Sequence, residues 1–169
     1  MKKLSESVWM DIHKQSSGDI DRKEDEYTNI RYIEPVDMGV SVLWADRDLE
    51  RKDGSYFFDY DDVSNAIQKS KWRIPTKKEV SELFKSAKHT NQSFETYTID
   101  GKSQLVFNKK GYLLPPNESE KIKHPWSYLA WTSDESEYDG HLAFAIYKAK
   151  SYEPMYSKCR LCVRLVKDK

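Results

Sequence analysis

The strongest structural signal in this chain is a nine-residue stretch that reads Trp72-Arg73-Ile74-Pro75-Thr76-Lys77-Lys78-Glu79-Val80. Thr76 can cap the first turn of a helix, and Glu79, three residues later, completes a capping box. Apolar residues then recur at the spacing of one helical face: Val80, Leu83, Phe84 and Ala87. We therefore expect an amphipathic helix from residue 77 to near His89, with this apolar stripe against a core.

A shorter helix and a strand region precede this stretch. The acidic residues within 59–62 suit a helix N-terminus, so we expect a helix that ends near Lys69. Before it, residues 36–45 (VDMGVSVLWA) alternate in polarity and contain β-branched side chains, which is typical of a strand or a strand pair. The composition becomes apolar only past Pro35, so the folded domain is expected to span residues 35–169.

Downstream, the chain favours β-structure. Asp100-Gly101 is a preferred dipeptide for a tight hairpin turn, which predicts antiparallel strands at 94–99 and 104–107. Further strands are expected at four places: 111–116, 128–132, 141–148 and 158–166. Two helices and mainly antiparallel strands in a chain of this length predict a single α+β domain.

Residues 1–34 differ in composition from the rest and are expected to form an extended N-terminal arm. They are strongly polar and offer little that could be buried. The few apolar residues, Val8, Trp9 and Ile12, fall on one short helical face. The interpretation remains open: this face docks onto a partner protein, or it folds back on its own domain, or the segment is a frayed terminus.

Composition excludes several classes of protein. The chain has 169 residues, with 28 basic and 28 acidic side chains and a formal net charge of zero. Such a balance gives no general attraction to nucleic acid or to a membrane surface. No apolar run could span a bilayer, and none follows Lys2 and Lys3 as in a secretory signal. We therefore expect no nucleic-acid binding, no membrane insertion and no classical export.

No constellation of residues points to catalysis, a metal ion or a cofactor. Cys159 and Cys162 lie in an alternating segment that directs their sulfurs to opposite faces, which suits neither a zinc site nor a redox pair. The four histidines follow no ligand spacing, and the chain has neither a nucleophile elbow nor a phosphate-binding glycine loop. The acidic loop 134–139 carries oxygen ligands for calcium, but a solvated loop is the preferred interpretation.

Aromatic side chains crowd the C-terminal loops. Planar rings with one polar edge suit the recognition of sugars or protein surfaces. The candidate ligand surface consists of Trp126, Tyr128, Tyr138, Tyr152 and Tyr156. The alternative interpretation is that Trp126 and Tyr128 close the core of the domain.

Several stretches carry a resemblance to a known family. They are residues 36–45, 72–79, 111–115, 131–133 and 163–166. From Val36 to Val166 the chain resembles the Fibrobacter succinogenes major paralogous domain, a family similar to C-type-lectin-like and formylglycine-generating-enzyme-like folds. The resemblance implies a C-type-lectin-like domain, with two helices packed on a twisted, mainly antiparallel sheet and long loops for ligands. It also implies that the first and last strands pair.

Two departures limit what this resemblance implies about activity. The Glu-Pro-Asn type triplet that binds sugar and calcium in true C-type lectins is absent, and the cysteine pair of the sulfatase-modifying relatives is not recognisable. Residues 4–12, together with 16–18 and 22–25, resemble N-terminal arms in structural proteins of gut bacteriophages. These departures argue against catalysis and against calcium-dependent sugar binding, and we expect a protein without enzymatic activity, metal or cofactor.

These observations predict a structural or display protein of a bacteriophage particle, a fibre such as a head fibre or a decoration protein attached to the capsid or the tail. In the virion, the arm would bind other virion proteins, the domain would recognise a bacterial surface glycan or protein, and the chain would form a homo-oligomer. One alternative is a cellular Bacteroidetes module that binds glycans or proteins. A second alternative is a carbohydrate-active or sulfatase-modifying relative, which predicts a pocket that brings Asp134 or Asp59 beside another titrating group.

Overall fold

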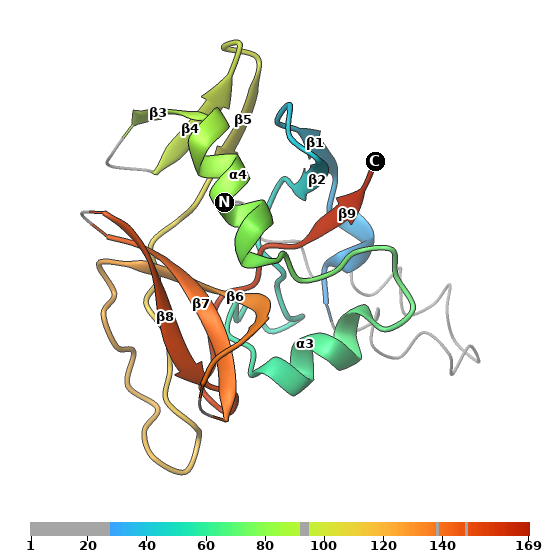
Figure 1. Cartoon of the computed structure of the whole chain (residues 1–169). Helices are drawn as coiled ribbons and strands as arrows, with labels where there is room; N and C mark the ends of the chain where they lie inside the picture. Colours follow the sequence, from blue (N-terminus) through green and yellow to red (C-terminus); the bar gives the residue numbers. More distant parts are fainter. Residues whose placement is uncertain (1–27, 92–94, 138, 148) are drawn as a thin grey trace.

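The computed structural model describes residues 28–91, 95–137, 139–147 and 149–169 (Figure 1). Within these ranges the chain is α+β, as the sequence predicts. The helical elements are a 3-10 helix η2 (Ile30–Tyr32), α3 (Tyr60–Ile67) and α4 (Lys77–Ser86). The strands are β1 (Pro35–Asp37), β2 (Val42–Ala45), β3 (Lys88–Asn91), β4 (Thr96–Ile99), β5 (Ser103–Val106), β6 (Tyr128–Glu135), β7 (Gly140–Ile146), β8 (Lys150–Tyr156) and β9 (Val166–Asp168).

The described strands form three small antiparallel sheets, not the one twisted sheet that the family resemblance implies. Their orders are β1-β2-β9, β3-β4-β5 and β6-β7-β8. The last strand pairs with β2, where Trp44 lies opposite Val166, so the two ends of the domain meet in one sheet. Figure 1 shows the three sheets as separate ribbons, with α4 beside the first two and α3 below them.

Local sequence signals account for both α-helices. The Thr76 side chain accepts a hydrogen bond from the Glu79 amide, and the Glu79 side chain accepts one from the Thr76 amide, so the predicted capping box is confirmed. Asp59 caps α3 in the same way, by accepting from the amide of Asp62. Helix α4 ends at Ser86, earlier than expected, because Lys88 already pairs with β4 in the adjoining sheet.

The predicted hairpin is also confirmed. Strands β4 and β5 flank Asp100 and Gly101, which both adopt positive φ values, +53° and +66°. A turn of this kind needs left-handed conformations at both central positions, and Asp-Gly supplies them at low cost.

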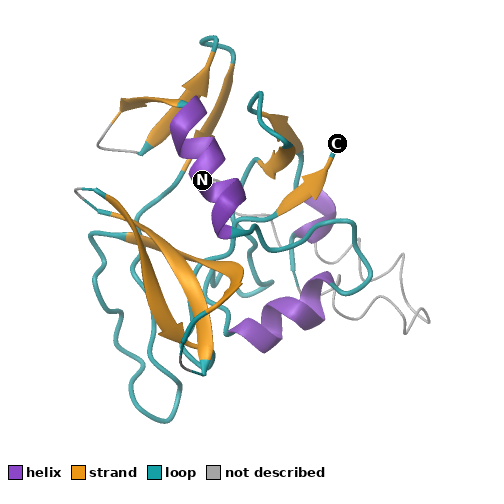
Figure 2. Ribbon diagram, viewed as in Figure 1, coloured by secondary structure: helices purple, strands orange, loops and turns teal. Residues whose placement is uncertain are grey.

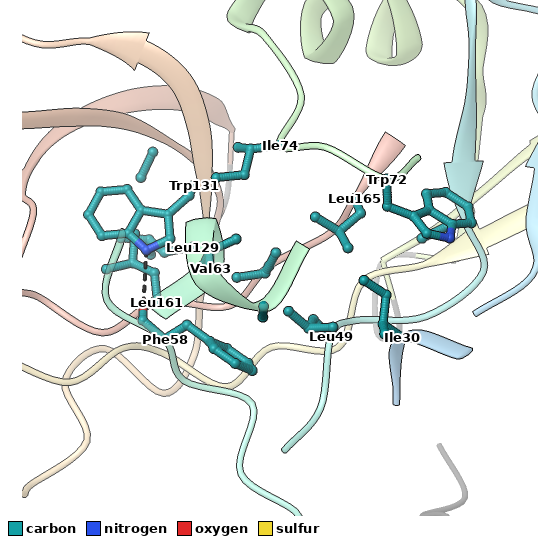
Figure 3. Packing of buried hydrophobic residues seen from close by; sticks show 14 of the residues in the cluster. Ile30, Leu49, Phe58, Val63, Trp72, Ile74, Leu129, Trp131, Leu161 and Leu165 are labelled. Atoms are coloured by element: carbon teal, nitrogen blue, oxygen red, sulfur yellow. Dashed lines mark hydrogen bonds between the residues drawn. The ribbon is translucent and has the colours of Figure 1, made fainter. Parts of the chain in front are cut away.

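Two apolar clusters form the core on either side of the segment 159–166. One contains Trp131, whose indole Nε1–H donates to the carbonyl of Phe58 at 2.9 Å (Figure 3). The other contains Trp44 and a group of aromatic rings around Phe107. Cys159 belongs to the first cluster and Cys162 to the second, so the two thiols face opposite ways, as expected.

Several segments differ from the sequence prediction, and the expected strand 111–116 forms only isolated bridges at Gly111, Tyr112 and Leu113. Residues 28–34 were assigned to the arm, but Ile30 and Ile33 are buried in the core, so the folded unit begins earlier than residue 35. The expected strand 158–166 is mostly irregular: it makes single bridges to neighbouring segments, and only its end joins β9. Conversely, residues 150–156 form β8, an exposed edge strand that lacks apolar alternation.

Candidate functional site

An aromatic cleft of about 470 Å³ lies between the loop that precedes β6 and the sheet β6-β7-β8. The loop runs beside the sheet and is drawn in teal in Figure 2. One wall comes from this loop and the other from β8 and the turn before it. The side chains that define the cleft are Tyr112, His124, Trp126, Tyr147, Glu153 and Met155.

Backbone contacts hold the loop wall in place. Tyr112 and Lys123 exchange both backbone hydrogen bonds, at 3.0 and 2.8 Å. The neighbouring Gly111 has φ +71°, and a Cβ at this position would lie 2.1 Å from the carbonyl oxygen of Lys123. Only glycine allows these two backbone segments to approach so closely. The carbonyl of His124 accepts from both the amide and the hydroxyl of Ser127, which fixes the turn that carries Trp126.

Trp126 is the most exposed large aromatic side chain among the described residues, at 53%. Its ring stacks on His124, with centroids 5.2 Å apart and planes inclined by 26°. His124 in turn meets the ring of Tyr112 edge to face, at 5.6 Å. Three rings therefore support one another, and one of them presents a large apolar area to solvent.

The opposite wall supplies a second aromatic ring and polar groups. Tyr147, at the end of β7, is 45% exposed. Ser151, Glu153 and Met155 alternate along β8, so their side chains point to the same face of the sheet. The Ser151 hydroxyl donates to the Glu153 carboxylate at 3.3 Å. The cleft thus combines flat apolar rings with an exposed carboxylate and hydroxyls, a set that can stack on a ligand and accept its hydrogen bonds.

The structure separates the five aromatic residues of the predicted ligand surface. Trp126 lies in the cleft. Tyr156 is 51% exposed but lines a neighbouring cleft with Asp139 and Pro154. Tyr138 lies outside the described residues, as do the predicted anchors Val8, Trp9 and Ile12.

Two of the predicted ligand residues have structural roles instead. Tyr128 is fully buried, and its hydroxyl donates to Asp48 at 2.8 Å, so the core interpretation is correct for this residue. Tyr152 points to the opposite face of β8 and fastens α4: its hydroxyl hydrogen-bonds Ser81 at 2.5 Å and donates to the Lys77 carbonyl. The core interpretation is wrong for Trp126.

Sequence reasoning missed five of the six residues that define the cleft: Tyr112, His124, Tyr147, Glu153 and Met155. Tyr112 and Tyr147 were placed in expected strands, which gave no reason to treat them as exposed. Glu153 was missed because β8 was not predicted. The alternation of exposed Ser151 and Glu153 with Tyr152 is the one local signal that could have found this wall.

Asp134 and Asp59, the two acidic residues singled out for a catalytic pocket, both have structural partners. Asp134 accepts a hydrogen bond from the Lys77 amide at the start of α4, and Asp59 caps α3. Neither carboxylate lines the aromatic cleft or the neighbouring cleft beside Tyr156. Within the described ranges, no group of three or more His, Cys, Asp or Glu side chains could hold a metal ion.

Comparisons with protein families, with curated proteins and with solved structures found no match to this chain. Among the residues that the structure covers, no helix has the length and hydropathy needed to cross a bilayer.

Proposed function

We propose that this protein is a non-catalytic recognition module that binds carbohydrate in the aromatic cleft. The observation that carries the proposal is the half-exposed ring of Trp126, which stacks on His124 at the rim of the 470 Å³ cleft. Leaving such a ring in water forgoes part of the hydrophobic stabilisation that its burial would provide. A sugar ring offers it a flat C–H face, while the sugar's hydroxyls can donate to Glu153.

We further propose that the domain is C-type-lectin-like and is displayed on a bacteriophage particle. The α+β architecture, the pairing of β9 with β2 and the long loops around the cleft support this interpretation. The resemblance of residues 4–25 to phage arms supports the attachment of the N-terminal segment to other virion proteins. Each large apolar anchor among Val8, Trp9 and Ile12 would contribute about 1.5–3 kcal/mol if fully buried. Many copies on one particle would convert weak sugar contacts into strong adhesion.

Substitution of Trp126 tests the proposed binding site. The wild-type protein is screened on an array of bacterial surface glycans, and the best ligand is then titrated by calorimetry. Trp126→Ala is expected to weaken binding by about 2 kcal/mol, or roughly 30-fold, as for a central aromatic contact. Ile122→Ala is the matched control, because Ile122 is also exposed (45%) on the same loop but does not line the cleft. Equal affinity of the Trp126→Ala variant and the control variant would exclude this cleft as the glycan site.

Display on a particle is tested separately. The phage is purified, and its proteins are identified by mass spectrometry and located by cryo-electron microscopy. We expect this chain in the virion, with its N-terminal segment against a neighbouring subunit. Its absence from purified particles would refute the virion assignment and leave the cleft proposal to the glycan titration.

A further inference from the structure

A second cleft, of about 350 Å³, lies on a different part of the domain and is charged where the first is aromatic. Its residues come from three segments: Arg47 and Asp48 after β2, Asn108 and Lys110 after β5, and Arg164 just before β9. Arg164 forms the floor, since its side chain is only 2% exposed. Lys110 is 19% exposed and Arg47 28%, so the basic groups become more accessible toward the rim.

The acidic groups of this cleft are already occupied by protein donors. Asp48 is 1% exposed, and its Oδ1 accepts from Arg164 Nε and the Tyr128 hydroxyl, each at 2.8 Å. Its Oδ2 accepts from Lys110 Nζ at 2.8 Å. At the rim, Arg47 holds the Asp46 carboxylate with two nitrogens, at 2.7 and 3.1 Å. Neither carboxylate is therefore well placed to bind a cation.

The cleft has, by contrast, more hydrogen-bond donors than the surrounding protein groups accept. Arg164 uses three of its five N–H groups, on Asp48 and on the carbonyls of Ala45 and Val106. Its guanidinium is stacked over Phe107, with 4.6 Å from Cζ to the ring centroid, so the remaining donors keep a fixed direction. Lys110 donates to Asp48 and to the Asn108 carbonyl, which leaves a third N–H. The Asn108 side-chain amide makes no hydrogen bond within the described part of the chain.

We propose that this cleft binds the carboxylate of a small ligand. A carboxylate offers two coplanar oxygens that accept several hydrogen bonds, which matches the unused donors of a guanidinium, an ammonium and an amide. Arg164 and Lys110 are already held in place by their hydrogen bonds to protein groups, so binding requires little loss of freedom in these two side chains. The site is independent of the proposed glycan site, because the residues of the two clefts do not overlap.

A pair of sugars that differ only at one carbon tests the proposal. The ¹⁵N-labelled full-length protein is titrated with D-glucuronate and, separately, with D-glucose, at constant ionic strength and pH. We expect glucuronate to shift the Asn108 side-chain amide and Arg164 Nε–H resonances in a saturable manner, and glucose to leave both unchanged. Equal shifts with both sugars, shifts confined to residues around Trp126, or the same response to inorganic sulfate would each overturn the assignment.

Variants link the response to this cleft. Asn108→Ala leaves the buried Asp48 contacts intact and is expected to weaken glucuronate binding by about tenfold, the factor for one lost hydrogen bond to a charged group. Lys110→Met should abolish binding, provided that its spectrum shows a folded protein. Lys102→Gln removes a positive charge from the exposed β4–β5 turn and should bind as wild type does. Unchanged affinity in Asn108→Ala, or an equal loss in Lys102→Gln, would show that the interaction is not made in this cleft.

Discussion

Asp48→Asn is the substitution that most directly tests how this fold is held together. Asp48 lies between three segments distant in sequence and receives hydrogen bonds from Arg164, Lys110 and Tyr128. Asparagine has nearly the same size, but it carries no charge and replaces one acceptor oxygen with an NH₂ group. The substitution would leave the buried guanidinium of Arg164 without its counter-charge and would place a donor against another donor.

We expect a large loss of stability because Asp48 and its buried partner Arg164 are almost completely shielded from solvent. Asp48 and Arg164 are 1% and 2% exposed, respectively. Removing one partner of a buried ion pair typically destabilises a protein by about 3–5 kcal/mol. With a urea m-value of about 2 kcal/mol/M, the midpoint of unfolding should fall by about 1.5–2.5 M.

Urea denaturation followed by tryptophan fluorescence provides the measurement. Asp46→Asn is the matched control, because Asp46 pairs with Arg47 in a position 25% exposed, where ion pairs contribute about 1 kcal/mol or less. A midpoint for Asp48→Asn as close to wild type as that of Asp46→Asn, with the same m-value, would refute the reasoning. That result would mean that water can solvate the Arg164 guanidinium in place of Asp48 without lowering the stability of the protein.

The stability difference between wild type and Asp48→Asn is also expected to depend on pH. Burial by itself would raise the pKa of Asp48, but the charges of Arg164 and Lys110 hold it below its ordinary value of 3.8. A carboxyl with a lowered folded-state pKa stabilises the protein fully above its unfolded-state pKa, and this contribution is lost as pH falls through the folded value. The stability difference between wild type and Asp48→Asn should therefore be constant from neutral pH down to about pH 5 and shrink below about pH 4.

Three further predictions concern other parts of the fold. Thr76→Ala removes the α4 cap and should cost about 1 kcal/mol in urea denaturation. Gly140→Ala would bring a Cβ within 2.0 Å of the Met155 carbonyl oxygen, so β7 and β8 should separate, with loss of amide protection along both strands in hydrogen exchange. Burial raises the pKa of Cys162 to about 12, so a thiol reagent at neutral pH should modify it only after addition of denaturant; rapid modification of the native protein would contradict its placement in the core.

The elements that the sequence predicted well depend on neighbours close in the chain. The capping box of α4 needs only Thr76 and Glu79, and the β4–β5 turn needs only Asp100 and Gly101. All the groups that form such hydrogen bonds, or that set such backbone conformations, lie within four consecutive residues. A pattern in the sequence therefore specifies them whatever the rest of the fold does.

Local sequence patterns could not predict which strands pair with one another. The segment 158–166 alternates like a strand, and its alternation does divide Cys159 from Cys162 between the two apolar clusters. Its backbone partners, however, are short irregular segments, including Phe58 and Leu113, so only single bridges form. Strand β8 is the opposite case: it forms a strand although its sequence has no alternating apolar pattern. As a mostly exposed edge strand, it needs only backbone hydrogen bonds to β7.

By itself, the sequence determined the helices, the hairpin turn, the α+β class and the presence of aromatic side chains near the C-terminus. Only the tertiary structure decided which aromatic residues meet a ligand: it buried Tyr128 against Asp48 and set Trp126 opposite Tyr147 and Glu153. It also assembled the charged cleft from residues as far apart as Arg47 and Arg164. The physical reason is that exposure and proximity depend on which distant segments pack together, and a local pattern of residue types carries no information about that.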